Sequence, residues 1–304
     1  MAGARPDWRV HAGLLFVQLA FGGFHVAAKF VIGHLHPLAL AGLRVAVATP
    51  LLLALAWAVD RVLPSRRELP RLALLGLLGV FTNQLLFILG LRFTTATNAS
   101  LLMPSIPVFA GLVAIVLGVE RPSRRRTLGI ALAVVGALVM LEPTRFQVGD
   151  RVLTGNLMIL ANCLSYATFL VLMRPVLRRL PATTVIAWSF LFGGCGVLAV
   201  AAGQLATVDP AAVPAAAWLA VLYIVLVPTT LAYLTNTWAV SRSTPSLAAT
   251  YTTLQPLSAG LLAFLLLGER VGWPQVIGGL LIVAGLQRVS TAAPPAAAVP
   301  AQPA

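Results

Sequence analysis

The sequence predicts an all-α integral membrane protein in which ten transmembrane helices form two inverted five-helix repeats. Of its 304 residues, 59% are hydrophobic and only 10% are charged, a composition far outside that of soluble domains. The chain also divides into ten apolar segments of the length that crosses a bilayer. Finally, two distant parts of the chain match each other residue by residue.

Each apolar segment lies between arginine clusters or stretches that contain proline, glycine or aspartate. Because a spanning helix needs about 20 mostly apolar residues, each segment is predicted as one helix. The predicted spans are 11–31, 38–58, 72–91, 96–118, 127–142, 154–173, 184–203, 215–239, 245–267 and 273–288. The fifth and tenth spans have only about 16 residues, so they are expected to cross nearly upright or to extend into their flanks.

Two stretches match without a gap at a spacing of 149 positions. The matched pairs are Thr95 and Thr244, Ala99 and Ala248, Pro107 and Pro256, Gly111 and Gly260, Glu120 and Glu269, Arg121 and Arg270, Gly129 and Gly278, and Gly136 and Gly285. The first repeat is predicted at 11–143 and the second at 154–288, with a cytoplasmic N-terminus at 1–10 and a disordered cytoplasmic tail at 289–304. Because each repeat has an odd number of spans, the second repeat enters the membrane from the opposite side, and the two repeats are inverted. Proteins of this kind often place a substrate site between the repeats.

The positions of the charges predict the orientation in the membrane. A net charge of +13 would suggest a nucleic-acid partner for a soluble protein, but here the arginines fit the bias of membrane proteins toward positive cytoplasmic loops. With the N-terminus inside, the cytoplasmic arginines are Arg5, Arg9, Arg61, Arg66, Arg67, Arg71, Arg121, Arg124, Arg125, Arg126, Arg174, Arg178, Arg179, Arg242 and Arg288, whereas Arg92, Arg145, Arg151 and Arg270 lie outside. We therefore expect a multi-pass protein of the cell inner membrane with both termini in the cytoplasm and no nucleic-acid partner.

The chain offers little for cofactor or metal binding. Its two cysteines, Cys163 and Cys195, both lie in predicted spans and are expected to be small buried residues. His34 and His36 lack a third ligand. All the acidic residues fall at span ends or in loops, so no pair of intramembrane acids is present for catalysis. We expect no cofactor, no metal and no enzymatic activity.

Several short motifs follow one another in a recognisable order. In the first half they are Gly22-Gly23-Phe24 leading to Lys29, Pro37 and Arg44, Gln84 ahead of Gly90-Leu91, the run Thr94 to Ser100, Pro107 and Gly118-Val119-Glu120. In the second half they are Tyr166, Pro181, Tyr233, Ser243-Thr244-Pro245-Ser246, Gln255-Pro256 and Leu267-Gly268-Glu269-Arg270. Their order and duplication resemble the EamA-like branch of the drug/metabolite transporter superfamily.

The resemblance covers nearly all of residues 11–289. It implies a ten-helix carrier of small metabolites, amino acids or drugs, with efflux favoured and the substrate left open. Its partners would be a small-molecule substrate and the lipid bilayer, and a monomer and a homodimer remain open. The sequence departs from the family pattern at Phe21, where many relatives have tryptophan, and at Trp188, which occupies the place of Arg44 in the second repeat.

Lys29, Arg44 and His25 are the basic side chains inside predicted spans that are candidates for a binding site. Arg44 lies seven residues past Pro37, roughly 10 Å into the second helix, and Lys29 lies near the outer end of the first. A charge at the centre of a spanning helix costs about 2.5 to 3.5 kcal/mol on insertion scales, so such residues usually face a cavity or a partner. Lys29 and Arg44 either attract an anionic substrate group together, or they snorkel toward outer headgroups or hold exposed backbone carbonyls. His25, one turn before Lys29, is either a substrate or proton ligand or a buried structural histidine.

Prolines inside the fourth and ninth spans point to a central site. Pro104, Pro107 and Pro256 cannot donate to the carbonyls of the preceding turn, and such breaks are tolerated only where protein or water satisfies them. We predict that these prolines break or gate the helices. The remaining predicted substrate ligands are Gln84, Asn98, Ser100, Asn162, Tyr166, Trp188, Tyr233, Asn236, Thr252 and Gln255. Polar packing between helices is the alternative for each of them.

Two further groups of residues are expected to shape the repeats. Glu120-Arg121 and Glu269-Arg270, at the ends of the fourth and ninth spans, are predicted to cap or pair locally. Glycines such as Gly76 and Gly193 permit close contact between helices. The leading functional hypothesis is a carrier that works by alternating access at a midplane site between the repeats. The alternatives are a flippase or exchanger for lipid-linked or nucleotide-type substrates and, as a weaker case, a membrane-embedded enzyme.

Overall fold

The computed structural model describes residues 8–118, 124–141, 151–242, 251, 254–269 and 272–290. Within these ranges the chain is helical, with no strand. The single-segment helices are α1 (Trp8–Val31), α2 (Pro37–Val59), α7 (Arg124–Leu141), α8 (Arg151–Leu177), α9 (Ala182–Ala206), α13 (Gln255–Leu267) and α14 (Trp273–Ser290). Three spans are interrupted: α3 (Leu69–Gly76), η1 (Leu77–Thr82) and α4 (Asn83–Phe93); α5 (Ala96–Leu102) and α6 (Ser105–Val116); and α10 (Ala215–Ile224), η3 (Val225–Leu231) and α11 (Ala232–Arg242).

These helices account for the predicted spans. Seven of the described spans are long and apolar enough to cross a membrane, namely α1, α2, α8, α9 and the three interrupted spans, and shorter apolar stretches occur at 127–136, 258–267 and 276–285. The first helix begins at Trp8, three residues before the predicted start, and α7 and α14 have 18 residues each. Most of the predicted ninth span before α13, and the predicted tail from residue 291, lie outside the described residues. The predicted class, an all-α membrane protein of two five-helix repeats, is confirmed.

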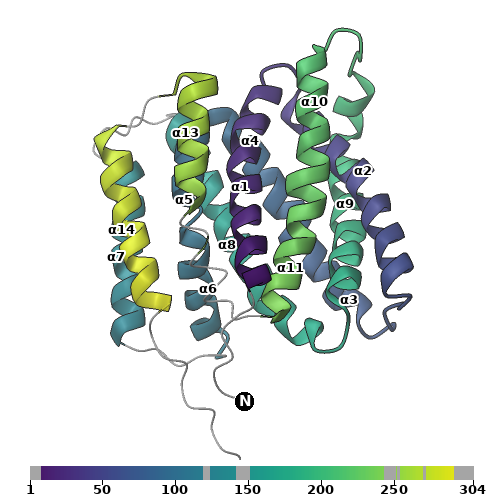
Figure 1. Ribbon diagram of the computed structural model, residues 1–304, viewed down its shortest axis with the longest axis horizontal. Helices are drawn as coiled ribbons and strands as arrows, with labels where there is room; N and C mark the ends of the chain where they lie inside the picture. Colours follow the sequence, from purple (N-terminus) through teal and green to yellow (C-terminus); the bar gives the residue numbers. More distant parts are fainter. Residues whose placement is uncertain are drawn as a thin grey trace, which may run out of the picture.

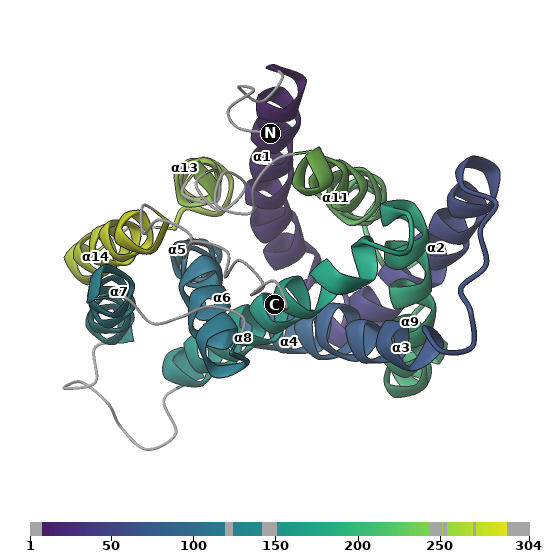
Figure 2. The ribbon, with the colours of Figure 1, turned by 90° about the horizontal axis from the view of Figure 1, so that it is seen from below.

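The helix contacts follow the duplication of the sequence. At the spacing of 149 residues, α4 corresponds to α11, α6 to α13 and α1 to α8. In the structure α8 packs against α4 and α6, and α1 packs in the same way against α11 and α13. The helices α2 and α9 pack on each other, as do α7 and α14, and the two pairs lie at opposite edges of the molecule (Figures 1 and 2). Each repeat therefore contributes a first helix that docks into the other repeat.

Both interruptions of the long spans by a π-helix fall at equivalent positions. The π-helix η1 covers Leu77–Thr82, and the same residues shifted by 149 positions fall within η3 at Val225–Leu231. A π-turn adds one residue to the helix and is frequently found at functional sites. The side chains that follow the π-turn therefore point in a different direction than they would on a regular helix. These side chains include Asn83 and Gln84 in one repeat and Tyr233 in the other.

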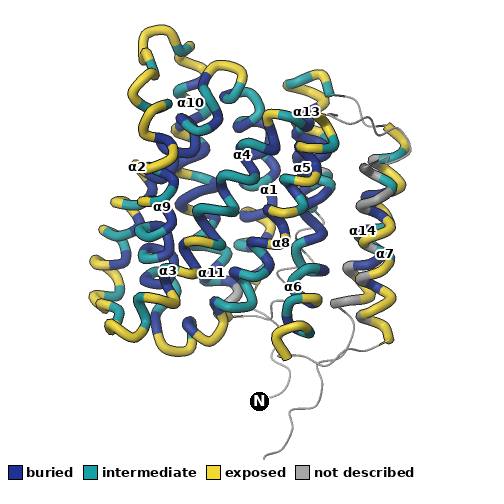
Figure 3. Tube along the Cα trace, turned by 180° about the vertical axis from the view of Figure 1, so that it is seen from behind, coloured by how far each residue is buried: buried dark blue, intermediate teal, exposed yellow. Residues whose placement is uncertain are grey.

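Burial is distributed as expected for a bundle with a packed interior and an apolar outer surface. Buried residues face the contacts between helices, and exposed residues cover the outside (Figure 3). Many of the exposed residues are large and apolar, for example Leu261, Phe264 and Leu266 on α13, which is a surface suited to lipid. The prediction for the cysteines is half correct, because Cys163 is buried whereas Cys195 is exposed on this outer surface.

Glycines bring the backbones of paired helices into contact. A Cβ atom on Gly76 of α3 would lie 2.6 Å from the carbonyl oxygen of Ser189 and 2.7 Å from the nitrogen of Gly193, both on α9. Carbon atoms do not approach backbone atoms this closely, so only glycine fits without separating the two helices. By contrast, a Cβ atom on Gly203, also on α9, would meet nothing within 4 Å.

We therefore expect opposite effects from two Gly→Ala substitutions. Gly76→Ala should lower the thermal unfolding midpoint of the detergent-purified protein, since overpacking typically costs about 1–3 kcal/mol. Gly203→Ala should leave the midpoint unchanged or raise it, because alanine at an unstrained helical position stabilises by about 0.4–1 kcal/mol. Tryptophan fluorescence during heating measures both. Equal midpoints for the two variants would contradict the close contact between α3 and α9.

Candidate functional site

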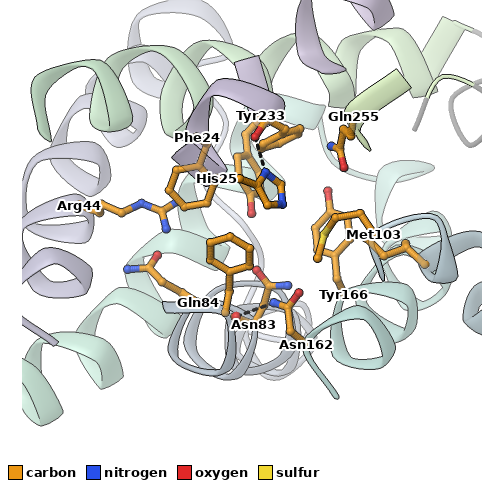
Figure 4. Close-up of a pocket in the computed structure, with 13 residues that line it drawn as sticks. Phe24, His25, Arg44, Asn83, Gln84, Met103, Asn162, Tyr166, Tyr233 and Gln255 are labelled. Carbon is orange, nitrogen blue, oxygen red and sulfur yellow. Dashed lines mark hydrogen bonds between the residues drawn. The ribbon is translucent and has the colours of Figure 1, made fainter. Parts of the chain in front are cut away.

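A cavity of about 80 Å³ lies inside the bundle, where the two repeats meet. Figure 4 shows its lining side chains, with Arg44 and Gln84 toward one end, Tyr166, Met103 and Gln255 toward the other, and His25 between them. The first repeat contributes α1, α2, α4 and the region around the α5–α6 break, and the second contributes α8, α11 and α13. The lining residues are Phe21, Phe24, His25, Arg44, Asn83, Gln84, Phe87, Met103, Ile106, Asn162, Tyr166, Tyr233 and Gln255.

Arg44 is the one charged residue among the described residues that line the cavity. Its side chain is only 4% exposed, and its Nε donates a hydrogen bond to Thr229 Oγ1 at 3.1 Å. The guanidinium carbon lies 4.4 Å from the centre of the Phe24 ring, a cation–π contact. The described part of the chain supplies no hydrogen-bond partner for the two Nη groups. Arg44 is therefore held in place through Nε and the ring, while its Nη groups are available to a ligand.

The position of Arg44 depends on a proline in η3. Pro228 has no N–H, so the carbonyl of Ile224 loses the donor that a regular helix would provide. The hydroxyl of Thr229 donates to that carbonyl at 2.6 Å. Since the hydroxyl hydrogen is engaged there, the oxygen is oriented to accept from Arg44. The proline break in the second repeat thus fixes a cation that belongs to the first repeat.

Two neighbouring threonines allow this role to be tested. Thr230 is also buried and donates to the carbonyl of Val225 at 2.8 Å, but it makes no hydrogen bond to Arg44. Thr229→Val and Thr230→Val should lower stability similarly, because each removes one buried hydrogen bond, worth about 1 kcal/mol. Only Thr229→Val should also weaken solute transport, seen as a raised KM. Identical transport by the two variants would contradict the positioning role of Thr229.

Polar side chains of α8 satisfy backbone groups of the interrupted third span. Asn162 Nδ2 donates to the carbonyl of Asn83 at 2.6 Å, and Ser165 Oγ donates to the carbonyl of Leu78 at 2.8 Å. On the other side of that span, Gln84 Nε2 donates to the carbonyl of Ala41 at 2.7 Å. The two bonds from α8 give partners to backbone carbonyls of the interrupted span, and the Gln84 bond ties this span to α2. Asn162 and Gln84 therefore line the cavity and hold the surrounding helices at the same time.

The fourth span breaks where its prolines predict an interruption. The α5 helix ends at Leu102 and α6 begins at Ser105, with Pro104 between them. The nitrogen of Met103 donates to the carbonyl of Ser100 at 3.2 Å, in place of the bond that Pro104 cannot make. Pro256 lies in the first turn of α13, where its missing N–H costs little. Whether these prolines also gate the pathway stays a prediction.

A second polar cluster lies at the end of the bundle where α5 begins, which we call the Glu269 end. The Glu269 carboxylate accepts from the nitrogens of Ala96 and Thr97, each at 3.0 Å, and from Thr97 Oγ1 at 2.8 Å. The Nζ of Lys29 donates to the carbonyls of Leu91 and Thr94 and is attracted by the charge of Glu269. The sequence predicts that Glu269 caps or pairs locally. It instead caps a helix of the other repeat, because the end of α13 lies against the start of α5.

The structure brings some of the predicted site residues together and places others elsewhere. His25, Arg44, Gln84, Asn162, Tyr166, Tyr233 and Gln255 line the cavity. Lys29 and Asn98 belong to the Glu269 end, where Asn98 Nδ2 donates to Thr94 Oγ1 at 3.3 Å. Ser100 is buried in α5 and donates to the carbonyl of Thr97, Trp188 packs against Phe192, and Asn236 lies half-buried on α11. Thr252 lies outside the described residues.

Sequence reasoning missed several residues of the site. The apolar wall of Phe24, Phe87, Met103 and Ile106 has no polar signal, so only the rotation of each helix about its axis reveals it. A signal for Thr229 is present in the sequence, because Pro228 interrupts the eighth apolar span just before two threonines, as Pro104 and Pro107 interrupt the fourth.

Together, the inverted repeats, the lipid-suited surface and the polar cavity between the repeats define a membrane transporter. Among the residues that the structure describes, no group of three His, Cys, Asp or Glu side chains is placed to hold a metal ion.

Comparison with known proteins identifies the family. The sequence profile described as the EamA-like transporter family matches this chain twice, at residues 9–142 and 153–291. The chain is 27% identical to an uncharacterized transporter of Archaeoglobus fulgidus, over 91% of this chain and 96% of that one. It is 29% identical to the protein WALLS ARE THIN 1 of Arabidopsis thaliana, over 93% and 83% of the two chains. Among solved structures, a crystal structure shares the fold with a TM-score of 0.64 at 20% identity, over 91% of this chain and 95% of that one. The protein belongs to the EamA-like transporter family.

Proposed function

We propose that the protein exports small organic solutes across the cell inner membrane by alternating access, with the cavity between the repeats as the binding site. The observation that carries the proposal is the composition of the cavity wall. Residues of both repeats line the cavity. A movement of one repeat relative to the other would therefore open the cavity to one side of the membrane or the other with the same lining residues. The tyrosines, amides and single cation of the wall suit a solute with polar groups on an apolar body.

The Glu269 end joins the two repeats and would have to open during alternating access. There, the nitrogen of Ala96 in α5 donates to Glu269, which follows α13. Thr94, directly after α4, donates through Oγ1 to Asn156 Oδ1 of α8 at 2.5 Å. Both hydrogen bonds join one repeat to the other. This end lies opposite the arginine-rich loops, so we assign it to the outside. A conformation sealed outside is the one that would accept a solute from the cytoplasm. Export then requires that the contacts of the Glu269 end separate.

Counterflow in proteoliposomes tests the proposal. The purified protein is reconstituted and loaded with one member of a metabolite panel at high concentration, and entry of the labelled form of the same compound is followed. Saturable entry that depends on the internal compound supports a carrier. Non-saturable entry would indicate a channel, movement of labelled lipid-linked or nucleotide-type substrate would favour the flippase or exchanger alternative, and conversion of the compound would favour an enzyme.

A further inference from the structure

Two buried atoms on the cavity wall have unsatisfied hydrogen-bonding capacity. Nδ1 of His25 lies 2.6 Å from the carbonyl oxygen of Phe21. A carbonyl oxygen only accepts, so Nδ1 carries the proton, and Nε2 of the neutral ring is an acceptor. This Nε2 is buried and has no hydrogen-bond partner among the described residues, and the same holds for Oε1 of Gln255. The side chains are only 2% and 6% exposed.

Such atoms indicate a missing ligand group. A buried polar atom without a partner costs about 1–3 kcal/mol, and the side chains of His25 and Gln255 both line the cavity, where a donor on a solute would satisfy these atoms. Tyr166 lines the same cavity as Gln255, and the rings of Phe87 and His25 form a T-shaped pair with centres 5.2 Å apart (Figure 4). Neutral acceptors surrounded by aromatic rings suit an ammonium group, which benefits from both.

The acceptors are separated from Arg44 by a ring. The guanidinium carbon of Arg44 lies 4.4 Å from the centre of Phe24, and the Phe24 ring centre lies 6.2 Å from that of His25. Figure 4 shows Phe24 between the two groups and Gln255 still farther from Arg44. A ligand that reaches both needs its anionic group and its donor at different ends of an apolar chain. In an α-amino acid the two groups share one carbon atom and cannot be separated in this way.

We infer that the cavity binds an ω-amino acid, with its carboxylate on the Nη groups of Arg44, its methylene chain against Phe24 and Phe87, and its terminal ammonium at His25 Nε2 and Gln255 Oε1. Each charged end of the ligand binds a different part of the cavity wall. A carboxylate without an amine leaves the acceptors unpaired, and an amine without a carboxylate leaves the buried guanidinium without a counter-charge. The assignment rests on the proposed transport function, because it names the substrate class of the same site.

Four related compounds test the inference. The probe is 5-aminopentanoate. Pentanoate lacks the ammonium, pentan-1-amine lacks the carboxylate, and norvaline is the isomer that carries the amine on the α-carbon. Each is titrated against the purified protein while the thermal unfolding midpoint is measured, since a ligand of the folded state raises it. We expect 5-aminopentanoate to act at a concentration about tenfold or more below the others, because sites built for hydrogen bonds discriminate strongly against analogues that lack them. Equal effects of norvaline or pentanoate would overturn the inference.

A matched pair of histidine variants localises the ammonium. His34 bonds through Nδ1 to the carbonyl four residues earlier, as His25 does, but it is exposed and away from the cavity. His25→Leu should remove most of the preference for 5-aminopentanoate over pentanoate, whereas His34→Leu should keep it. If His25→Leu does not fold, Gln255→Leu serves instead, because it removes the other proposed acceptor of the ammonium group. A preference that survives in both cavity variants would contradict the assignment.

Counterflow separates failure of this inference from failure of the proposed function. Counterflow of 5-aminopentanoate supports both. If other solutes show counterflow and 5-aminopentanoate does not, the inference is contradicted and the carrier function is still supported. If folded protein shows counterflow of no compound, both are contradicted.

Discussion

Replacing Arg44 with glutamine is expected to raise the KM for an anionic or zwitterionic solute about tenfold to 100-fold, because hydrogen bonds to charged groups contribute about 1.5–3 kcal/mol. Arg44 is the one charged side chain on the described cavity wall, and its Nη groups have no partner in the described chain. Neutral solutes should be affected much less. Initial rates in proteoliposomes over a range of solute concentrations measure the effect.

Two further variants make this result specific. Arg44→Lys keeps the positive charge but loses the planar fork that binds a carboxylate through two parallel bonds, so its KM should lie between those of the parent and Arg44→Gln. Arg174→Gln removes an exposed arginine at the end of α8 and should behave as the parent. Unchanged uptake by well-folded Arg44→Gln would refute the role of Arg44 in binding.

Replacing Glu269 with glutamine is expected to loosen the Glu269 end and favour opening there. The carboxylate accepts three hydrogen bonds from the first turn of α5, and a neutral amide oxygen accepts them more weakly. A loss of about 1.5 kcal/mol would raise the open population about tenfold. A reporter cysteine at Ala263 suits the measurement, because this residue is fully buried beside Ala96 and Val26 where α13 meets α5 and α1. Its labelling by a maleimide should become about tenfold faster in Glu269→Gln.

The experiment needs a background without native thiols and a matched control. Cys195 is exposed and would react, so both native cysteines are replaced. Glu68 accepts from the nitrogen and hydroxyl of Ser65, each at 3.0 Å, within one exposed turn. Glu68→Gln should leave the labelling rate unchanged. Equal labelling of the Glu269→Gln and Glu68→Gln variants would show that Glu269 does not hold this end closed.

The site illustrates why sequence reasoning reached some residues and not others. Arg44, Gln84 and Tyr233 are polar residues in apolar surroundings, which marks them in any sequence. Lys29 carried the same mark, yet it lies at the Glu269 end, where it holds two backbone carbonyls. The difference between Lys29 and Arg44 depends on which carbonyls and rings lie nearby, and these belong to helices far away in the chain.

The sequence by itself determined the class of the fold, the approximate limits of the spans and the pairing of the repeats. The bilayer makes this possible, since it requires long apolar helices and leaves a hydropathy signal that depends on local composition alone. Only the tertiary structure decided which polar residues face the common cavity, which carboxylate caps which helix and how Pro228 positions Arg44. These features depend on the rotation and depth of each helix relative to the others, and contacts between residues far apart in the chain set both.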